Sequence, residues 1–159
     1  MSEVIIRDME ARDLDQVSVL AAQLVRQHHG FDARRFLLVE PVEQGYRWFL
    51  DSQLGEAGVL LLVAEVDGAI AGYVYGALEE RNWALLLDAH GAIHDVFVDQ
   101  RFRRRGVAKR LMQVAIDRLE AQAEQVVLSS ASPNLEAQSL FRSLGFRDTM
   151  VEMTRSRAR

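Results

Sequence analysis

Residues 95–111 read DVFVDQRFRRRGVAKRL: a short apolar strand, a basic turn around Gly106, and the first turns of an amphipathic helix. The first N–H groups of a helix have no intrahelical acceptor and carry the positive end of the helix dipole. A strand-to-helix turn that contains a glycine can therefore surround a phosphate with backbone donors. This stretch predicts an α/β fold with a binding site for a phosphorylated ligand.

The segments on both sides of this stretch predict further strands and helices. Asp67-Gly68 separates two β-rich runs and suits a two-residue type I′ hairpin turn, because both central residues then adopt positive φ. Asp13 with Gln16 resembles a capping box that opens a helix. The expected strands are residues 4–7, 59–66, 69–76, 92–98, 126–130 and 149–154, and the expected helices are residues 13–30, 41–53, 106–122 and 134–143.

The resulting order, β-α-α-β-β-β-α-β-α-β, predicts a mixed, mostly antiparallel central sheet with helices on both faces. The crossover from residue 92 to residue 130 favours two parallel strands with a right-handed connection. Ligands of such sheets bind near the carboxyl ends of the parallel strands. One segment is ambiguous, because residues 83–87 are apolar enough to continue a strand, whereas residues 88–91, Asp-Ala-His-Gly, favour a loop.

Composition limits the classes of protein to which the chain can belong. Its 159 residues, 49% of them hydrophobic, are expected to form one domain, residues 1–159. The absence of cysteine excludes disulfides, thiolate metal sites and a cysteine nucleophile. The longest apolar run, residues 59–64, is too short to span a bilayer, and the N-terminus lacks a signal-peptide core. We therefore expect a cytoplasmic protein that does not act at a membrane.

The basic turn is a local feature of a mildly acidic chain. The net charge of −4 argues against general nucleic-acid binding. Neither a Walker A motif nor a three-glycine dinucleotide fingerprint is present. An isolated arginine run is often only a solvated turn. Here it follows a strand and precedes a helix, and this position favours an anion site.

Two motifs resemble those of the GCN5-related N-acetyltransferase (GNAT) family. Arg103-x-x-Gly106-x-Ala108 is similar to its coenzyme A pyrophosphate loop, [Arg/Gln]-x-x-Gly-x-[Gly/Ala]. Residues 134–146 are similar to its next motif, Asn-x-x-Ala-x-x-[Leu/Phe]-Tyr-x-x-x-Gly-Phe. The N-terminal β-α-α unit and the hairpin also lie where the family places them. The resemblance thus covers nearly the whole chain and implies the GNAT fold.

The resemblance implies an acetyl-coenzyme A-dependent N-acetyltransferase in which a primary amine attacks the thioester directly in a ternary complex. The loop would hold the pyrophosphate through backbone N–H groups, and the central strand would hold the pantetheine arm. No acyl-enzyme is expected, which agrees with the absence of cysteine. The residues expected to bind the cofactor are Val96, Phe97, Val98, Arg103, Arg104, Arg105, Gly106, Val107, Ala108, Lys109, Asn134 and Phe141.

The catalytic candidates are His94 and Asp95. The family often has a glutamate at the position of His94, and histidine is a reasonable replacement as a base because it titrates near neutrality. Adjacent side chains of a strand face opposite sides unless a bulge intervenes, so one of the two is expected to pack structurally. Asp95 is the second choice.

Two other positions of the second motif have alternative interpretations. Phe141 replaces the tyrosine that commonly protonates the leaving thiolate in the family; the ring can pack against pantetheine but cannot donate a proton. The proton would then come from water, from the attacking amine or from a hydroxyl such as Ser139. Asn134 can act as a helix N-cap, as a polar contact to pantetheine, or as both.

The acceptor, a small-molecule or peptide amine, is expected near His28, Phe31, Tyr46, Glu79 and Trp83. The adjacent His28 and His29 make a poor ligand set, so no metal is expected. The acidic residues of this region could attract a cationic amine or simply form a solvated loop. The sequence does not choose among acceptors.

Two rival functions remain open at this point. A protein of the same fold could bind acetyl-coenzyme A as a sensor or scaffold without efficient turnover. The cluster from Arg101 to Arg110 could instead belong to a nucleic-acid-binding module, although we expect no nucleic acid as partner. Dimers are common in the resembling family, so a homodimer is also a candidate.

Overall fold

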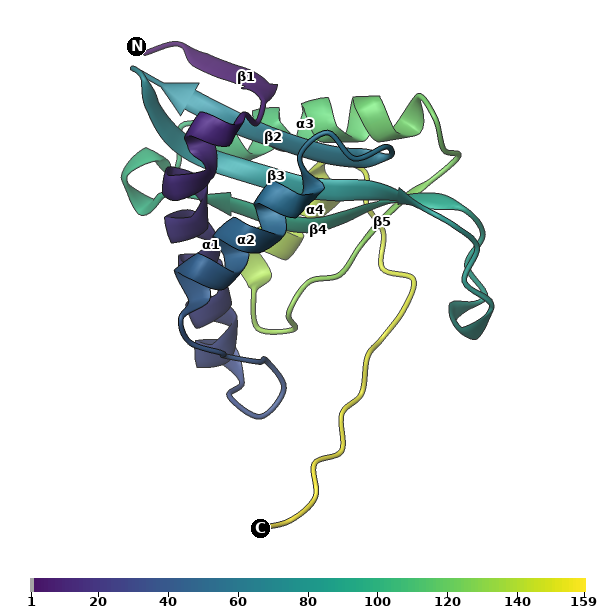
Figure 1. Cartoon of the computed structure of the whole chain (residues 1–159). Coiled ribbons are helices and arrows are strands. Elements are labelled where there is room, and N and C mark those ends of the chain that lie inside the picture. The colour runs from purple at the N-terminus through teal and green to yellow at the C-terminus, as the bar shows by residue number, and fades with distance from the viewer. Residues whose placement is uncertain (1) are drawn as a thin grey trace.

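A five-stranded sheet with the order β1-β2-β3-β4-β5 organises the chain in the computed structural model, which describes residues 2–159 (Figure 1). Strands β1 to β4 pair antiparallel, and β4 and β5 pair parallel, as expected. The strands are β1 (Val4–Asp8), β2 (Val59–Val66), β3 (Ala69–Glu79), β4 (His90–Val98) and β5 (Val126–Leu128). The helices are α1 (Leu14–Phe31), α2 (Val42–Gln53), α3 (Val107–Glu120) and α4 (Leu135–Ser143), with 3-10 turns η1 (Ala11–Asp13), η2 (Trp83–Leu85) and η3 (Gln100–Phe102).

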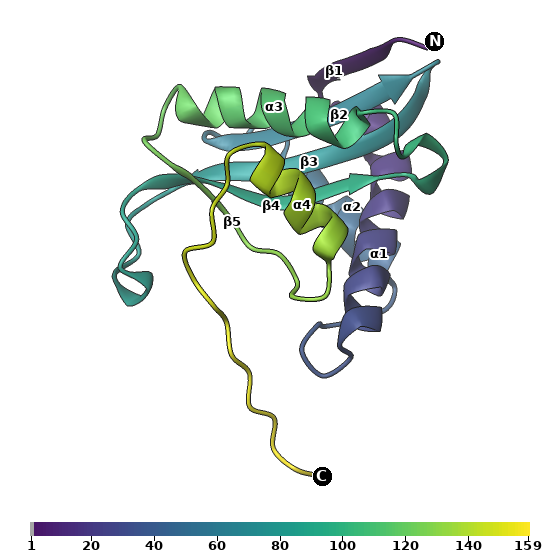
Figure 2. The same cartoon turned by 180° about the vertical axis from the view of Figure 1, so that it is seen from behind.

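Helices cover both faces of the sheet and create two hydrophobic cores. Figure 1 shows α1 and α2 on one face, and Figure 2 shows α3 and α4 on the other. The core under α1 and α2 includes Leu14, Leu50 and Tyr73, whereas the core under α3 and α4 includes Leu111 and Phe141. The expected mixed sheet with helices on both faces is confirmed. Within residues 2–159, no helix is both long and apolar enough to cross a membrane.

The hairpin between β2 and β3 is confirmed, and so is the start of α1, whose N-cap is Asp13, but the predicted capping box is wrong. Asp67 and Gly68 both adopt positive φ, +50° and +78°, as the turn type requires. The capping box does not join Asp13 to Gln16. Instead, Asp13 accepts a hydrogen bond from the backbone N–H of Glu10 at 2.8 Å, one turn earlier, and is also bound by Arg7 at 2.7 Å.

Strand β4 begins at His90, so the prediction that residues 88–91 form a loop is wrong at its end. A Cβ at Gly91 would lie 2.8 Å from the Cβ of Leu119 in α3. The glycine therefore permits close packing of a helix on a strand and does not mark a turn. Residues 83–87 do not continue the strand, because Trp83–Leu85 forms the 3-10 turn η2 and only Asn82 and Leu87 form a bridge.

The last predicted strand, residues 149–154, is not formed. The chain beyond α4 is exposed and has no strand or helix in residues 147–159. It leaves the sheet as a long tail in both cartoons (Figures 1 and 2). A β-prone sequence becomes a strand only when another strand supplies the ladder hydrogen bonds, and nothing in this chain does so here.

Candidate active site

The parallel pair β4 and β5 separates along its length. Its register runs from Gly91 opposite Val126 to Ile93 opposite Leu128, where β5 ends. Strand β4 continues to Val98 and therefore has a free edge on the β5 side. The expected pantetheine residues, Val96 to Val98, lie along this free edge. The backbone groups exposed there can bind an extended ligand.

A β-bulge interrupts β4 at His94. Tyr75 lies opposite Asp95, but the next residue, Gly76, lies opposite Ile93, so His94 is the extra residue. Both His94 and Asp95 consequently face α1 and α2: the His94 ring lies 5.2 Å from the Tyr75 ring, and Asp95 accepts a hydrogen bond from Tyr46 of α2. Adjacent side chains of a regular strand would face opposite sides. The bulge at His94 is the exception that turns both side chains to the same face.

Glu79 links two histidines at the end of the sheet. The Nε2 atom of His94 lies 2.5 Å from one carboxylate oxygen of Glu79, and the Nε2 atom of His90 lies 3.5 Å from the other. His90 is buried, with its Nδ1 atom 2.8 Å from the carbonyl oxygen of Asp88. The His94 side chain is 41% exposed and is therefore open to a ligand.

This contact defines the proton arrangement of His94. An ionised carboxylate only accepts hydrogen bonds, so the Nε2 atom of His94 carries a proton toward Glu79. In the neutral ring the Nδ1 atom then holds a free lone pair. His94 can thus accept a proton at Nδ1 while Glu79 fixes the orientation of the ring.

Asp95 forms a separate, mostly buried cluster with two tyrosines. The Oδ2 atom of Asp95 accepts hydrogen bonds from the hydroxyls of Tyr46 at 3.1 Å and Tyr73 at 3.0 Å. Burial raises the pKa of Asp95 above its ordinary value, although both tyrosine hydrogen bonds oppose the rise. Burial and the charge of Asp95 raise the pKa values of Tyr46 and Tyr73, so both remain hydroxyl donors.

The turn before α3 has the geometry of an anion site. Arg104 and Gly106 both adopt left-handed backbone conformations, with φ of +62° and +74°. Arg110 is the first residue of the helix to donate to a backbone carbonyl, that of Gly106 at 3.1 Å, so the preceding N–H groups of residues 107–109 remain available as donors. A Cβ built on Gly106 meets nothing within 4 Å, so the space in front of this turn is open.

Some basic side chains near the turn are already engaged. The Nε atom of Arg103 donates to the carbonyl oxygen of Val98 at 3.0 Å, and its guanidinium lies 5.2 Å from the centre of the Phe97 ring. Arg101 pairs with Asp99 at 2.7 Å. These contacts tie the turn to the end of β4, and Arg104 and Arg105 are exposed beside it.

The second motif lies in α4. The side chain of Asn134 accepts a hydrogen bond from the N–H of Ala137 at 3.3 Å, so the expected N-cap is confirmed. Phe141 is only 7% exposed and packs in the core under α3 and α4, 6.2 Å from the Phe146 ring. The ring that we expect to contact pantetheine is therefore also a packing residue.

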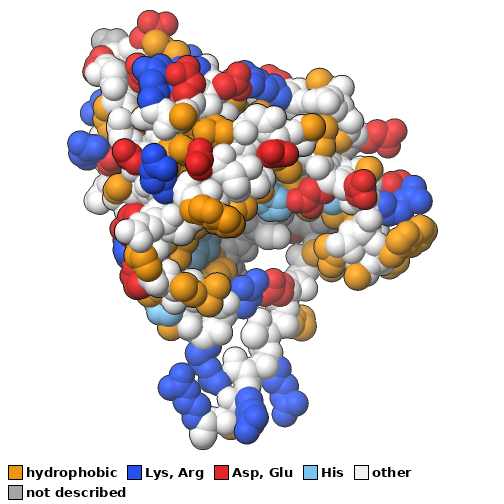
Figure 3. All heavy atoms as spheres, in the orientation of Figure 1, with side chains coloured by type: hydrophobic (Ala, Val, Ile, Leu, Met, Phe, Trp, Pro, Cys, Tyr) orange, Lys and Arg blue, Asp and Glu red, His pale blue; other side chains and the backbone are white. Residues whose placement is uncertain are grey.

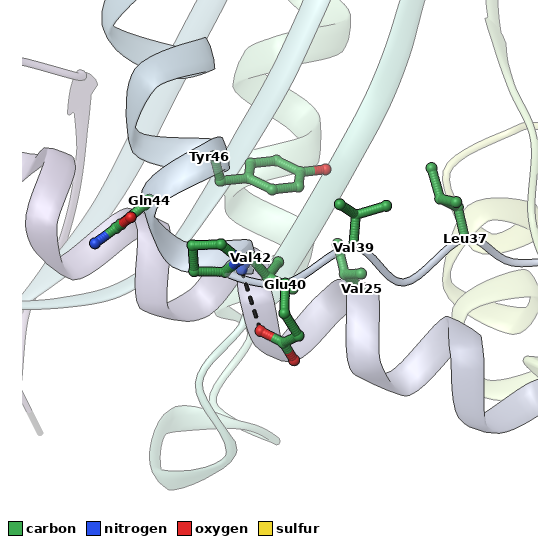
Figure 4. Close-up of a pocket in the computed structure, with 9 residues that line it drawn as sticks. Val25, Leu37, Val39, Glu40, Val42, Gln44 and Tyr46 are labelled. Carbon is green, nitrogen blue, oxygen red and sulfur yellow. Dashed lines mark hydrogen bonds between the residues drawn. The ribbon is translucent and has the colours of Figure 1, made fainter.

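An apolar groove opens beside Tyr46. Its volume is about 670 Å³, and it is lined from α1, α2 and the loop between them (Figure 4). In Figure 4 the Tyr46 ring lies along the groove with its hydroxyl pointing to the side on which Val39 and Leu37 lie. The same hydroxyl contacts Asp95. Tyr46 therefore belongs both to the wall of the groove and to the Asp95 cluster.

The other expected acceptor residues are only partly brought together. Glu79 lies at His94, and Tyr46 lies at Asp95. The Nδ1 atom of His28 lies 2.9 Å from the carbonyl oxygen of Leu24. The His28 ring packs against Phe31 and Phe36, so His28 and Phe31 stabilise the end of α1. No group of three or more His, Cys, Asp or Glu side chains in the described chain could hold a metal ion.

Trp83 does not join this site. It is 74% exposed in η2, at the tip of the β3–β4 connection, where the guanidinium of Arg81 lies 5.2 Å from its ring (Figure 1). Sequence reasoning also missed His90 and Tyr73. His90 lies directly opposite Glu79 in the β3–β4 register, and a correct strand start at residue 90 would have placed it there.

Comparisons with known proteins show the family to which the sequence is similar. The sequence model of the Acetyltransferase (GNAT) family matches residues 23–146. An N-alpha-acetyltransferase of Sulfurisphaera tokodaii is 28% identical over 123 residues, which cover 72% of this chain and 71% of the relative. The L-amino acid N-acetyltransferase AaaT of Escherichia coli is 26% identical over 148 residues, which cover 92% of this chain and 84% of the relative.

A solved structure shows that the fold is shared. The aminoglycoside N-acetyltransferase AAC(6')-Iy, in complex with CoA, superposes with a TM-score of 0.78 and is 21% identical, covering 99% of this chain and 97% of that chain. The chain thus has both the sequence pattern and the fold of this group of proteins.

Proposed function

The chain belongs to the acetyltransferase (GNAT) family, and from this premise we propose that it transfers the acetyl group of acetyl-coenzyme A to a primary amine by direct attack in a ternary complex. The observation that carries the proposal is the free edge of β4 beyond Ile93. The bulged residue His94 lies at the start of this edge, and the open turn before α3 lies beyond its far end. These features support an arrangement in which an anion site, an extended binding edge and a base follow one another along one strand.

The residues present fit the donor. A pyrophosphate carries negative charge, and the N–H groups of residues 107–109 together with the helix dipole stabilise such a charge. The left-handed conformations at Arg104 and Gly106 are typical of backbone concavities that bind anions. When bound, acetyl-coenzyme A supplies the thioester carbon that the amine attacks.

His94 is our candidate for the base. A lysine-like amine has a pKa of ~10.4 and is mostly protonated at neutral pH, so a proton must leave before attack. The Nδ1 atom of His94 takes this proton, directly or through water, and Glu79 stabilises the resulting imidazolium from the Nε2 side. The new bond joins the amine nitrogen to the acetyl carbon as the bond from carbon to sulfur breaks.

Asp95 has a positioning role in this proposal. Its Oδ2 atom is occupied by the hydroxyls of Tyr46 and Tyr73, and burial makes its ionised form less favourable. The carboxyl group therefore holds the wall of the groove and the bulge in place. Because Phe141 has no hydroxyl, the thiolate receives its proton from water or from the proton lost by the amine.

We place the acceptor in the groove beside Tyr46. Its lining is mostly aliphatic, and Glu40 at its rim pairs with Arg26 at 3.3 Å. An amine attached to an apolar group fits such a lining better than a highly charged molecule does. The related enzymes named above act on different acceptors, so the class of amine is the part of the proposal that needs an assay.

Nucleic-acid binding is not favoured. The chain carries a net charge of −4, and Asp99 neutralises the charge of Arg101 at the start of the basic turn. A sensor without turnover would share the coenzyme site and differ only in the lack of transfer. Release of free thiol separates these two functions.

The test combines calorimetric titration of coenzyme A with a thiol-release assay on a panel of amines. We expect binding at micromolar concentrations and thiol release with at least one primary amine. Absence of binding at hundreds of micromolar would overturn the proposal. Binding without release to any amine of the panel would favour the sensor.

The chain offers a matched pair of glycine variants for the turn. Gly106 and Gly55 have nearly equal φ values, +74° and +76°, and a Cβ on either meets nothing within 4 Å. The backbone strain of Gly106→Glu and Gly55→Glu is therefore similar. We expect only Gly106→Glu to abolish coenzyme A binding, because its carboxylate repels phosphate. Equal loss in both variants would show that the turn is not the binding site.

A further inference from the structure

His90 is a buried histidine beside the pair formed by His94 and Glu79. It lies directly opposite Glu79 in the β3–β4 register and is only 5% exposed. The Nε2 atom of His94 lies 2.5 Å from one carboxylate oxygen of Glu79, and the Nε2 atom of His90 lies 3.5 Å from the other. Figure 3 shows histidine and acidic side chains gathered where the β3–β4 hairpin leaves the body of the molecule. One carboxylate is therefore shared between an exposed ring and a buried ring.

The surroundings of His90 define where its ring carries protons. Its Nδ1 atom lies 2.8 Å from the carbonyl oxygen of Asp88, and its Nε2 atom faces Glu79. A carbonyl and an ionised carboxylate only accept hydrogen bonds, so a ring that serves both carries a proton on each nitrogen. A buried charge needs a partner, and Glu79 balances the charge of this ring. His90 thus directs an N–H group at the second oxygen of Glu79.

The turn before β4 fixes the His90 ring. The carboxylate of Asp88 accepts a hydrogen bond from the N–H of Ala89 at 2.8 Å and pairs with Arg81 at 2.9 Å. These contacts hold residue 88, whose carbonyl oxygen faces the Nδ1 atom of His90. By contrast, the side chain of Glu79 is 39% exposed, and the terminal torsion of a glutamate is broad. The direction of the Glu79 carboxylate therefore depends on a partner that is itself fixed.

We propose that His90 is a positioning residue for the proposed acetyl transfer. It holds Glu79 so that the carboxylate keeps the Nε2 proton of His94 on its own side and leaves the Nδ1 atom of His94 free for the amine. This orientation matters because a His94 ring with its proton on Nδ1 would present no lone pair there. The inference rests on the proposed function of His94 as the base. His90 is buried and acts only through Glu79.

Asparagine and glutamine separate the two nitrogens of His90. The amide nitrogen of asparagine replaces Nδ1 and can donate to the carbonyl of Asp88, whereas that of glutamine replaces Nε2 and can donate to Glu79. We expect His90→Asn to lower kcat about tenfold with the KM for acetyl-coenzyme A unchanged, and His90→Gln to retain most of kcat. In a Glu79→Gln background, His90→Asn should cause no further loss, because both residues act through one contact. Loss in the glutamine variant alone would show that His90 only supports the turn, and would overturn the proposal.

His29→Asn is the matched control. The Nδ1 atom of His29 lies 2.9 Å from the carbonyl oxygen of Phe36, so the same kind of contact is kept, but His29 belongs to α1 and not to the sheet. We expect its kcat to equal that of the wild type. A fall in kcat as large as that of His90→Asn would contradict a specific role of His90. Calorimetry with coenzyme A confirms that each variant is folded.

Nitrogen-15 NMR of the histidine rings tests the positioning without the reaction. The nitrogen shifts distinguish rings that carry the proton on Nδ1, on Nε2 or on both. In the wild type we expect both protons on His90 and only the Nε2 proton on neutral His94. His90→Asn should mix the two neutral forms of His94, and His90→Gln should keep the wild-type form.

The two readouts separate this inference from the proposed function. Unchanged His94 signals in His90→Asn, or a wild-type His90 with a proton on Nδ1 alone, would overturn the positioning role whatever the activity. The expected signals in a chain that acetylates no amine would instead refute the proposed function and leave the positioning of His94 established.

Discussion

The two residues at the β4 bulge have different surroundings: His94 forms an accessible pair with Glu79, and Asp95 belongs to a buried cluster. His94 and Glu79 face solvent, with 2.5 Å between the Nε2 atom and the carboxylate, whereas Asp95 lies under Tyr46 and Tyr73. A base must reach the amine, and a positioning group must hold its surroundings. The exposures of the two groups match these separate roles.

Glu79→Gln tests the accessible pair. The amide can still contact His94 but no longer stabilises an imidazolium, so we expect kcat to fall about tenfold to a hundredfold and the KM for acetyl-coenzyme A to remain unchanged. His94→Gln should lower kcat further, by about 10²- to 10⁴-fold. The neighbouring Glu80→Gln is the control, because Glu80 is exposed. An equal loss in Glu80→Gln would rule out the special role of Glu79.

Asp95→Asn tests the buried cluster through the pH dependence of stability. The pKa of Asp95 is raised in the folded protein, so folding takes up a proton between the unfolded and folded pKa values. Wild-type stability therefore falls as pH rises through the folded pKa, whereas the asparagine of the variant remains neutral and still accepts both tyrosine hydrogen bonds. We expect the free energy of unfolding of the variant, relative to wild type, to increase from pH 4 to pH 7.5, by about 1.4 kcal/mol for each unit of pKa difference.

Urea denaturation at the two pH values measures this difference. Asp88→Asn is the opposite control: its hydrogen bond to Arg81 lowers the pKa of Asp88, so its ionised form stabilises the folded state above the unfolded pKa. The stability contributed by this ionised form is lost only as pH falls through the lowered pKa of Asp88, so the relative stability of this control should stay nearly constant from pH 4 to pH 7.5. A pH-independent difference for Asp95→Asn would contradict the buried, destabilised carboxylate.

At the scale of elements, the site depends on how two strands and two helices end. Strand β5 stops at Leu128 while β4 continues to Val98, and α3 begins beyond the end of β4. Helix α4 starts at the Asn134 cap and packs Phe141 beneath the same part of the sheet. A short β5 therefore creates the opening, and the two helix starts border it.

Asn134→Ala tests whether this cap is only structural. Loss of the hydrogen bond to the N–H of Ala137 should lower the free energy of unfolding by about 1 kcal/mol. Asn134→Ser keeps a capping oxygen and should restore most of this stability. Calorimetry with coenzyme A then separates the roles, because a cap without ligand contact leaves binding nearly unchanged in both variants. Weaker binding in the stable serine variant would instead reveal a contact from the amide.

At the scale of the whole molecule, the proposed donor site spans the turn before α3, the free edge of β4 and the start of α4. A ligand that binds only the folded state adds about 2.7 kcal/mol at a concentration of 100 times its Kd. For a chain of this length, the melting temperature should then rise by roughly 5 to 10 °C. Thermal denaturation with and without coenzyme A measures this shift. Gly55→Glu should retain the shift and Gly106→Glu should lose it; a shift retained by Gly106→Glu would place the ligand elsewhere.

The sequence by itself determined the features that depend on neighbouring residues. Helix periodicity, the Asp67-Gly68 turn, the Asn134 cap and the glycine turn before α3 arise from local dihedral angles and hydrogen bonds, and the structure confirms them. The fold class also follows, because the order of elements and the crossover leave few topologies.

Only the tertiary structure decided the features that depend on register between distant strands. The bulge that turns His94 and Asp95 to one face, the contact of Glu79 with His90 and His94, and the burial of Asp95 against Tyr73 all join residues separated along the chain. The tail also depends on pairing between distant segments. Residues 149–154 have the composition of a strand, but a strand exists only where another edge pairs with it, and in this chain alone no edge does.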